Sequence, residues 1–190
     1  MKISDSLIEK WIDRARRQEA RFGHNTGHFS LPYEKENTIT GTIGEGLVVE
    51  YFKKYLAPKS DEYKIDLASY GAPFDIEIEN KLNRKIYRIH VKTGLWKNWP
   101  SENFDFGIHA DQYQYLVSYP LILVSLLKSD HEFPRIGRIE GFLTPQQITT
   151  FPIIRKGEVF PHTGVVSRTD NILTQFSHYQ NCEELIKWMS

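Results

Sequence analysis

A short stretch of the chain carries four charged side chains whose spacing suits chemistry on a phosphate ester. Asp75 and Glu77 are two residues apart, so in a strand both point to the same face. His90 and Lys92 have the same spacing in the next apolar–polar alternation. Six polar-rich residues, 80–85, separate the two segments, which favours an antiparallel hairpin. Pairing of the apolar faces then gathers two carboxylates, an imidazole and an ammonium group, a set suited to a hard divalent metal beside a phosphate.

The same alternation has a simpler explanation. A half-buried hairpin ordinarily alternates apolar and charged residues because water covers its second face. Alternation alone therefore favours a solvated face over a site, and the interpretation as a site depends on the motifs around it.

Hydrophobic spacing predicts the elements that position this hairpin. Leu7, Trp11 and Ile12 form an apolar stripe that predicts a helix over 4–22. Gly, Asn and Pro residues predict a loop over 23–37. The further expected elements are a helix over 42–56, strands over 63–67, 74–79, 86–93, 120–127 and 138–143, an irregular aromatic segment over 96–110, a helix that begins at Thr144, and a last helix over 181–189. This order indicates one mixed α/β sandwich.

Composition excludes several classes of protein. The 190 residues contain a single cysteine, Cys182, which excludes an internal disulfide framework and a cysteine-based zinc site. The longest strongly apolar run, Leu121–Leu127, is far too short to span a membrane, and we expect a cytoplasmic protein. Gly41 and Gly44 lack the Lys-Ser/Thr ending of a phosphate-binding loop, so no nucleotide cofactor is expected.

The 24 basic and 24 acidic side chains cancel, which argues against non-specific coating of nucleic acid. A nuclease remains compatible with this balance, because carboxylates at a metal site offset a basic binding face elsewhere.

Three motifs follow one another in the order of a known superfamily. They are Gly41-Thr-Ile-Gly-Glu45 on a predicted helix, Phe74-Asp-Ile76, and Ile89-His-Val-Lys-Thr-Gly94. Their succession resembles the PD-(D/E)XK nuclease superfamily, which includes many type II restriction endonucleases and archaeal Holliday-junction resolvases. The resemblance covers about residues 41–94 and extends weakly to 142–148.

The resemblance implies a restriction-endonuclease-like α/β fold, a three-layer sandwich with a central mixed β-sheet flanked by helices. It implies a single nuclease-like domain over 1–190, with an N-terminal helix and loop over 1–40, a catalytic core over 41–150 and a C-terminal extension over 151–190.

The resemblance also assigns roles to individual residues. Glu45 would be the helix carboxylate that reaches the metal directly or through water, and Asp75 the central metal-binding acid. Lys92 would be the catalytic lysine, and its neighbour Thr93 has no clear role. The implied cofactor is Mg²⁺ or Mn²⁺, the implied substrate is DNA, expected to be double-stranded, and a palindromic target would imply a homodimer.

His90 stands where the superfamily places Glu, Asp or sometimes Gln. Imidazole is a poor ligand for Mg²⁺ and a good one for Mn²⁺ and other transition metals. Three outcomes follow: an altered metal preference, a second carboxylate drawn from Glu77 or Glu45, or a domain that binds without cutting. We favour the second, with His90 acting on the attacking water.

Basic and aromatic residues near these motifs are candidates for contact with nucleic acid. Arg14, Arg16 and Arg17 lie on the first predicted helix, where a phosphate-tracking stripe and a solvated face are equally good explanations. Trp96 and Lys97 follow the second strand and suit base stacking, although packing over a sheet edge is as good an explanation. Arg88 lies near the hairpin turn, and a solvated turn is the simpler interpretation.

We therefore predict a metal-dependent DNA endonuclease, similar to the type II restriction enzymes. The alternative is a catalytically impaired nuclease-like module that binds DNA or protein. A third hypothesis, from a different class, is an α/β interaction protein whose hairpin charges are only solvated surface.

Overall fold

The hairpin around Asp75 is part of a five-stranded mixed sheet. The computed structural model describes residues 1–22, 32–69 and 72–189. The strands are β1 (Tyr63–Leu67), β2 (Ile76–Asn80), β3 (Lys85–Trp96), β5 (Leu121–Leu127) and β6 (Ile136–Leu143), in the order β1-β2-β3-β5-β6. Strands β3 and β5 run parallel, and every other pair is antiparallel.

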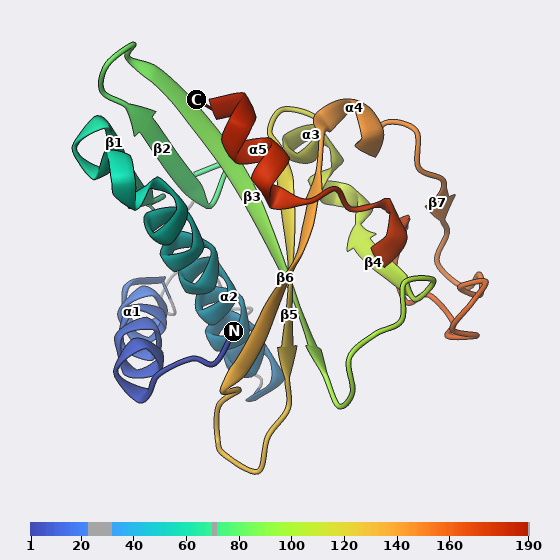
Figure 1. Cartoon of the computed structure of the whole chain (residues 1–190). Helices are drawn as coiled ribbons and strands as arrows, with labels where there is room; N and C mark the ends of the chain where they lie inside the picture. Colours follow the sequence, from blue (N-terminus) through green and yellow to red (C-terminus); the bar gives the residue numbers. More distant parts are fainter. Residues whose placement is uncertain (23–31, 70–71, 190) are drawn as a thin grey trace.

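Three helices cover one face of this sheet (Figure 1). They are α1 (Asp5–Phe22), α2 (Pro32–Leu56) and α5 (Cys182–Met189), and a 3-10 helix, η1 (Ala57–Glu62), follows α2. Their buried side chains form one core with Ile76, Ile89 and Val124 of the sheet. Trp11 of α1 lies against Gly46 of α2, where an added Cβ would come within 2.3 Å of the indole, so α1 packs closely on α2.

A second, three-stranded sheet lies over the other face, in the order β4-β8-β7. Its strands are β4 (Asp105–His109), β7 (Ile153–Ile154) and β8 (Asn171–Gln175), and the short helices α3 (Tyr113–Leu116), α4 (Pro145–Ile148), η2 (Ala110–Gln112) and η3 (Phe176–His178) connect them to the larger sheet. Leu121 and Leu123 of β5 belong to this second core, whereas Ile122 and Val124 belong to the first. Strand β5 is therefore buried on both faces, as its continuous apolar run predicts.

Most predicted elements are present. Thr144 caps α4 through a reciprocal pair of hydrogen bonds with Gln147, at 3.2 and 2.8 Å, as the Thr-Pro-x-Gln sequence predicts. Residues 151–190 supply β7, β8 and α5, so the part expected as an extension contributes to both cores. The chain is a mixed α/β structure whose five-stranded sheet is flanked by helices. No helix in the described ranges is long and apolar enough to span a bilayer.

Two predictions of irregular structure are wrong. Helix α2 begins at Pro32, so 32–37 is helical, whereas 23–31 lies outside the described residues. Proline suits the first turn of a helix, where its missing N–H leaves no hydrogen bond unmade. In the aromatic segment 96–110, residues 105–109 form β4, whose partner β8 comes more than sixty residues later in the chain. A pairing so distant leaves no local signal.

Candidate active site

The predicted antiparallel hairpin is formed by β2 and β3. Asp75 lies directly before β2 and extends its ladder in both directions: its N–H donates to the Ile89 carbonyl at 2.9 Å, and its carbonyl accepts from the Ala68 N–H at 2.9 Å. Because hydrogen bonds hold its backbone on two sides, the position of the Asp75 side chain is fixed by the sheet.

Asp75 and His90 face each other at one end of the hairpin. The Oδ2 atom of Asp75 accepts a hydrogen bond of 2.7 Å from the Val91 N–H and lies 3.8 Å from His90 Nδ1. The Asp75 side chain is 31% exposed and the His90 side chain 8%, so water reaches the carboxylate more readily than the imidazole. A gap of 3.8 Å is too long for a direct hydrogen bond.

A backbone carbonyl fixes the orientation of the His90 ring. His90 Nε2 lies 3.0 Å from the Tyr115 carbonyl oxygen, and the His90 ring is buried. A carbonyl only accepts hydrogen bonds, so Nε2 carries a proton and Nδ1 is directed at Asp75. Histidines that bind metals usually donate their other ring N–H to such a carbonyl.

Lys92 lies two residues beyond His90 on the same face of β3 and lines the same pocket as Asp75 and His90. This pocket has a volume of about 260 Å³. Burial lowers the pKa of the Lys92 ammonium below its ordinary value, and the neighbouring charges of Asp75 and Glu45 act in the opposite direction. The predicted grouping of these side chains on one face of the hairpin is therefore present.

Glu45 reaches this site from α2. Burial, and secondly the charge of Asp75, raise the pKa of Glu45 from 4.5 to about 8, against the opposing effect of Arg14 and Lys92. The helix comes this close because its Gly44 has no side chain: an added Cβ would lie 2.0 Å from Thr93 Oγ1 of β3. Thr93 thus provides the surface against which α2 packs. A carboxyl with so high a pKa beside a second carboxylate is typical of functional sites.

The three arginines of α1 lie in different surroundings. Arg14 donates a hydrogen bond of 2.9 Å to the Ala68 carbonyl, and its charge acts on Glu45. Arg17 forms an ion pair of 3.1 Å with Asp13 on the helix surface. Of the three, Arg14 alone is brought to the candidate site.

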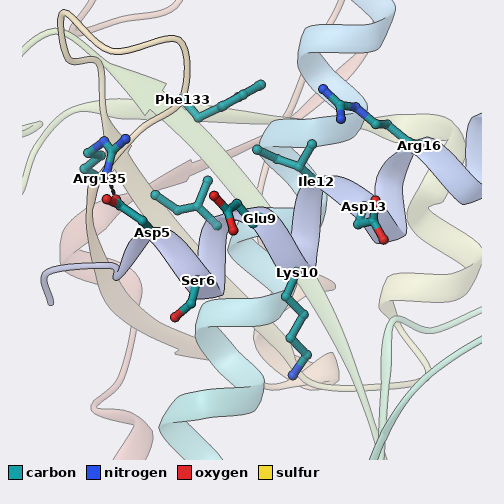
Figure 2. A pocket seen from close by; sticks show the side chains of 10 residues that line it. Asp5, Ser6, Glu9, Lys10, Ile12, Asp13, Arg16, Phe133 and Arg135 are labelled. Carbon is teal, nitrogen blue, oxygen red and sulfur yellow. Dashed lines mark ion pairs between the residues drawn. The ribbon is translucent and has the colours of Figure 1, made fainter.

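Arg16 lines a larger pocket, of about 680 Å³, between α1 and the segment before β6 (Figure 2). Ile8, Ile12 and Phe133 supply its apolar surface, and acidic and basic side chains alternate around it. Figure 2 shows the ion pair of Arg135 with Asp5 at one end and Arg16 at the other. None of the three motifs contributes to this pocket.

Glu77 forms an ion pair with the residue opposite it. The register of β2 and β3 pairs Glu77 with Arg88, and Arg88 Nε lies 3.0 Å from Glu77 Oε2. The Arg88 guanidinium also stacks 4.9 Å from the centre of the Phe74 ring. Glu77 is absent from the pocket that holds Asp75, His90 and Lys92, which leaves Glu45 as the second carboxylate near the site.

Trp96 packs against the second core. Its indole lies among Phe104, Phe106 and Phe176, with ring centres 5.1 to 6.2 Å apart, and its Nε1 donates to Ser125 Oγ at 3.1 Å. These contacts favour packing over base stacking for Trp96. Lys97, the next residue, is exposed.

In the described part of the chain, no group of three or more His, Cys, Asp or Glu side chains is placed to hold a metal ion. Asp75 and His90 supply two ligands. Mg²⁺ is commonly held by one or two carboxylates together with waters and substrate phosphates, and imidazole favours Mn²⁺. Two adjacent ligand atoms about 2.1 Å from one metal lie about 3.0–3.4 Å apart in octahedral or tetrahedral coordination, so the separation of 3.8 Å would have to shorten slightly around a shared ion.

Comparison with the models of known protein families gives no match, and comparison with curated proteins gives none either.

The pocket also contains residues that the sequence did not single out. Gln112 of η2 and Tyr115 and Leu116 of α3 form its opposite side, and Ala72 and Pro73 lead into Phe74. The aromatic content of 96–119 was the available signal for Tyr115, but only the fold shows that this segment returns to the end of β3.

Proposed function

We propose that the protein is a metal-dependent endonuclease that hydrolyses phosphodiester bonds of DNA, on a restriction-endonuclease-like variant of the observed α/β fold. The observation that carries this proposal is the convergence of Asp75, His90 and Lys92 on one pocket, with Glu45 beside them. These side chains come from all three motifs of the sequence resemblance. A solvated hairpin face explains their alternation but not the buried ring of His90 or the raised pKa of Glu45.

Each residue has a distinct task in this mechanism. The carboxylate of Asp75 and Nδ1 of His90 would hold the metal, which gives His90 a different role from the action on the attacking water expected from the sequence. The metal, when bound, would activate a water and neutralise phosphate charge. The Tyr115 carbonyl keeps the His90 ring oriented. Lys92 places its ammonium where negative charge develops on the phosphate oxygens. Glu45 adds a carboxyl group that loses its proton when positive charge approaches.

Plasmid cleavage tests this proposal. Supercoiled plasmid, single-stranded DNA and RNA are incubated with the protein in Mg²⁺ and in Mn²⁺, beside Lys92→Ala. Lys59→Ala is the matched control, because Lys59 is exposed and lies outside the pocket. We expect metal-dependent DNA cleavage that disappears in Lys92→Ala and persists in Lys59→Ala, and cleavage that survives in both variants would contradict the proposal.

The imidazole of His90, a poor ligand for Mg²⁺ beside Asp75, is the observation behind a second candidate, a nuclease-like module that binds DNA without cutting it. In that case DNA binding persists in Lys59→Ala, weakens in Lys92→Ala, and is accompanied by no cleavage in either metal. A homodimer on palindromic DNA stays a prediction, which sedimentation of the protein with and without DNA measures.

A further inference from the structure

The pocket at Asp75 is larger than metal chemistry requires. Asp75, His90 and Lys92 supply its titratable groups for metal and phosphate, and the remainder is formed by Ala72, Pro73, Phe74, Gln112, Tyr115 and Leu116. Its volume of about 260 Å³ lies just below the range of about 300–1,000 Å³ that encloses drug-sized molecules. A space of this size is comparable to one nucleobase with its sugar.

The aromatic residues of the pocket are held in place. The Phe74 ring lies under the guanidinium of Arg88 at 4.9 Å and against the edge of the Tyr119 ring at 5.9 Å. Tyr115 is 44% exposed, so its side chain is accessible to a ligand, whereas its carbonyl is bound to His90 Nε2. The same residue thus links the aromatic surface to the side chains that would handle the phosphate.

Gln112 adds a group that recognises hydrogen-bonding edges. Its side chain is half-buried, lines the pocket, and has no hydrogen-bond partner within the described part of the chain. A primary amide offers two donors and two acceptor lone pairs, and amide side chains commonly pair with the edges of bases. An amide left unpaired in a pocket is available to a ligand.

We propose that this pocket holds one unpaired nucleotide, with its phosphate at Asp75, His90 and Lys92 and its base against Phe74 and Tyr115. This inference depends on the proposed nuclease function and names its substrate: a nucleotide outside a base-paired stack. Such a nucleotide comes either from single-stranded DNA or from a duplex that extrudes one base. Stacking on aromatic rings is tolerant of sequence, since every base has a π-face.

Binding without cleavage tests the inference. Fluorescence anisotropy in Ca²⁺ measures the dissociation constants of labelled single-stranded DNA, a matched duplex, and a duplex with one mismatched base pair. We expect single-stranded DNA to bind at least about tenfold tighter than the matched duplex. Tyr115→Ala keeps the backbone carbonyl that His90 needs and should weaken single-strand binding by at least about fivefold. Tyr113→Ala, on the same short helix but outside the pocket, is the matched control and should leave binding unchanged.

The results separate this inference from the proposed function. Equal binding of single-stranded and matched duplex DNA, or equal effects of Tyr115→Ala and Tyr113→Ala, would overturn the nucleotide pocket even if Lys92-dependent cleavage is found. Tyr115-dependent binding without cleavage would support the pocket and contradict the endonuclease. 2-Aminopurine at the mismatched position distinguishes the two sources, because its fluorescence rises when the base leaves a duplex stack.

Discussion

Two of the three aspartate–histidine pairs among the described residues use the same residue types in opposite ways. In the larger sheet, Asp75 is 31% exposed and its histidine, His90, 8% exposed, with 3.8 Å between Oδ2 and Nδ1. In the smaller sheet, the Asp105 side chain has no exposed surface, His162 is 52% exposed, and the two groups are 3.0 Å apart. One pair leaves its carboxylate open to a pocket, and the other seals its carboxylate inside the fold.

Hydrogen bonding explains the difference. Asp105 accepts from the backbone N–H groups of His162 and Thr163, at 2.6 and 3.2 Å, and from the Gln175 amide at 3.4 Å. Burial alone would raise the pKa of Asp105, but these bonds and the His162 ring hold it below its ordinary value. Asp105 therefore ties the segment around His162 to β4. At Asp75 a single backbone N–H is bound, and the remaining acceptor capacity is available to a ligand.

The largest difference between variants of Asp75 and Asp105 is expected in the rate of DNA cleavage. In the proposed mechanism Asp75→Asn removes the negative charge that would hold the metal. Because metal activation would supply several kcal/mol, the initial rate of plasmid cleavage should fall by about 1,000-fold or more. Asp105→Asn, measured at a temperature where it is folded, should retain most of the activity. A rate that falls equally in the two variants would refute the distinction between an open and a sealed pair.

The stability of the protein should show the reverse contrast. Asp105→Asn replaces an ionised acceptor with a neutral amide, whose NH₂ group can only donate. This amide would face two backbone N–H groups and the His162 ring. The substitution should therefore cost about 3 kcal/mol in the free energy of unfolding. For 190 residues that is a fall of roughly 6–12 °C in Tm. Asp75→Asn should change Tm far less.

This stabilisation also has a defined pH dependence. The pKa of Asp105 in the folded state lies below the ordinary value of 3.8, so its contribution is complete above that value and is lost as pH falls through the lower folded pKa. Urea denaturation at about pH 7 and in acid should show the gap between wild type and Asp105→Asn closing only below pH 3.8. An equal gap at both pH values would mean that Asp105 acts by shape rather than by charge.

Asp75, Glu77 and Lys92 show how much of the candidate site the sequence predicts. Alternation places Asp75 and Lys92 on one face, and the hairpin follows from the length of its turn. The same alternation treats Glu77 as equivalent to Asp75. Only the register, which sets Glu77 opposite Arg88, separates them.

Other features depend on contacts that local sequence does not encode. Asp105 and His162 are 57 residues apart, and only the pairing of β4 with β8 brings this part of the fold together. Tyr115 reaches His90 through its backbone carbonyl, an atom that every residue type carries, so its identity gives no signal.

The carboxyl group of Glu45, near Asp75, should give the free energy of unfolding a pH dependence opposite in sign to that caused by Asp105. The raised pKa of Glu45 means that the folded protein keeps a proton that the unfolded chain releases between pH 4.5 and about 8. Stability therefore falls as pH rises through this window. Glu45→Gln removes the penalty, and should raise the free energy of unfolding above about pH 8 by about 2 kcal/mol, allowing for partial access of water.

Denaturation in metal-free buffer measures this gain, which should vanish below pH 4.5. Adding Mn²⁺ should reduce it, because a bound cation stabilises the ionised carboxylates of the wild type. A gain that is the same at every pH would indicate that Glu45 is destabilising for reasons of packing alone.

The smallest expected effect concerns the close approach of helix α2 to strand β3 at Gly44, next to Glu45. Gly44→Ala places a methyl group 2.0 Å from Thr93 Oγ1, so the helix must shift away from the strand and carry Glu45 with it. Overpacking outweighs the better helix propensity of alanine, for a net loss of about 1 kcal/mol in the free energy of unfolding.

Gly41→Ala is the control, because nothing lies within 4 Å of the added Cβ, and it should stabilise the helix by up to about 1 kcal/mol. Burial and, secondly, the charge of Asp75 raise the pKa of Glu45, and both weaken if the helix moves away from the strand. Gly44→Ala should therefore also flatten the fall in stability above pH 4.5, whereas Gly41→Ala should preserve it. If Gly44→Ala leaves that slope intact, the surroundings of Glu45 do not depend on the contact between Gly44 and Thr93.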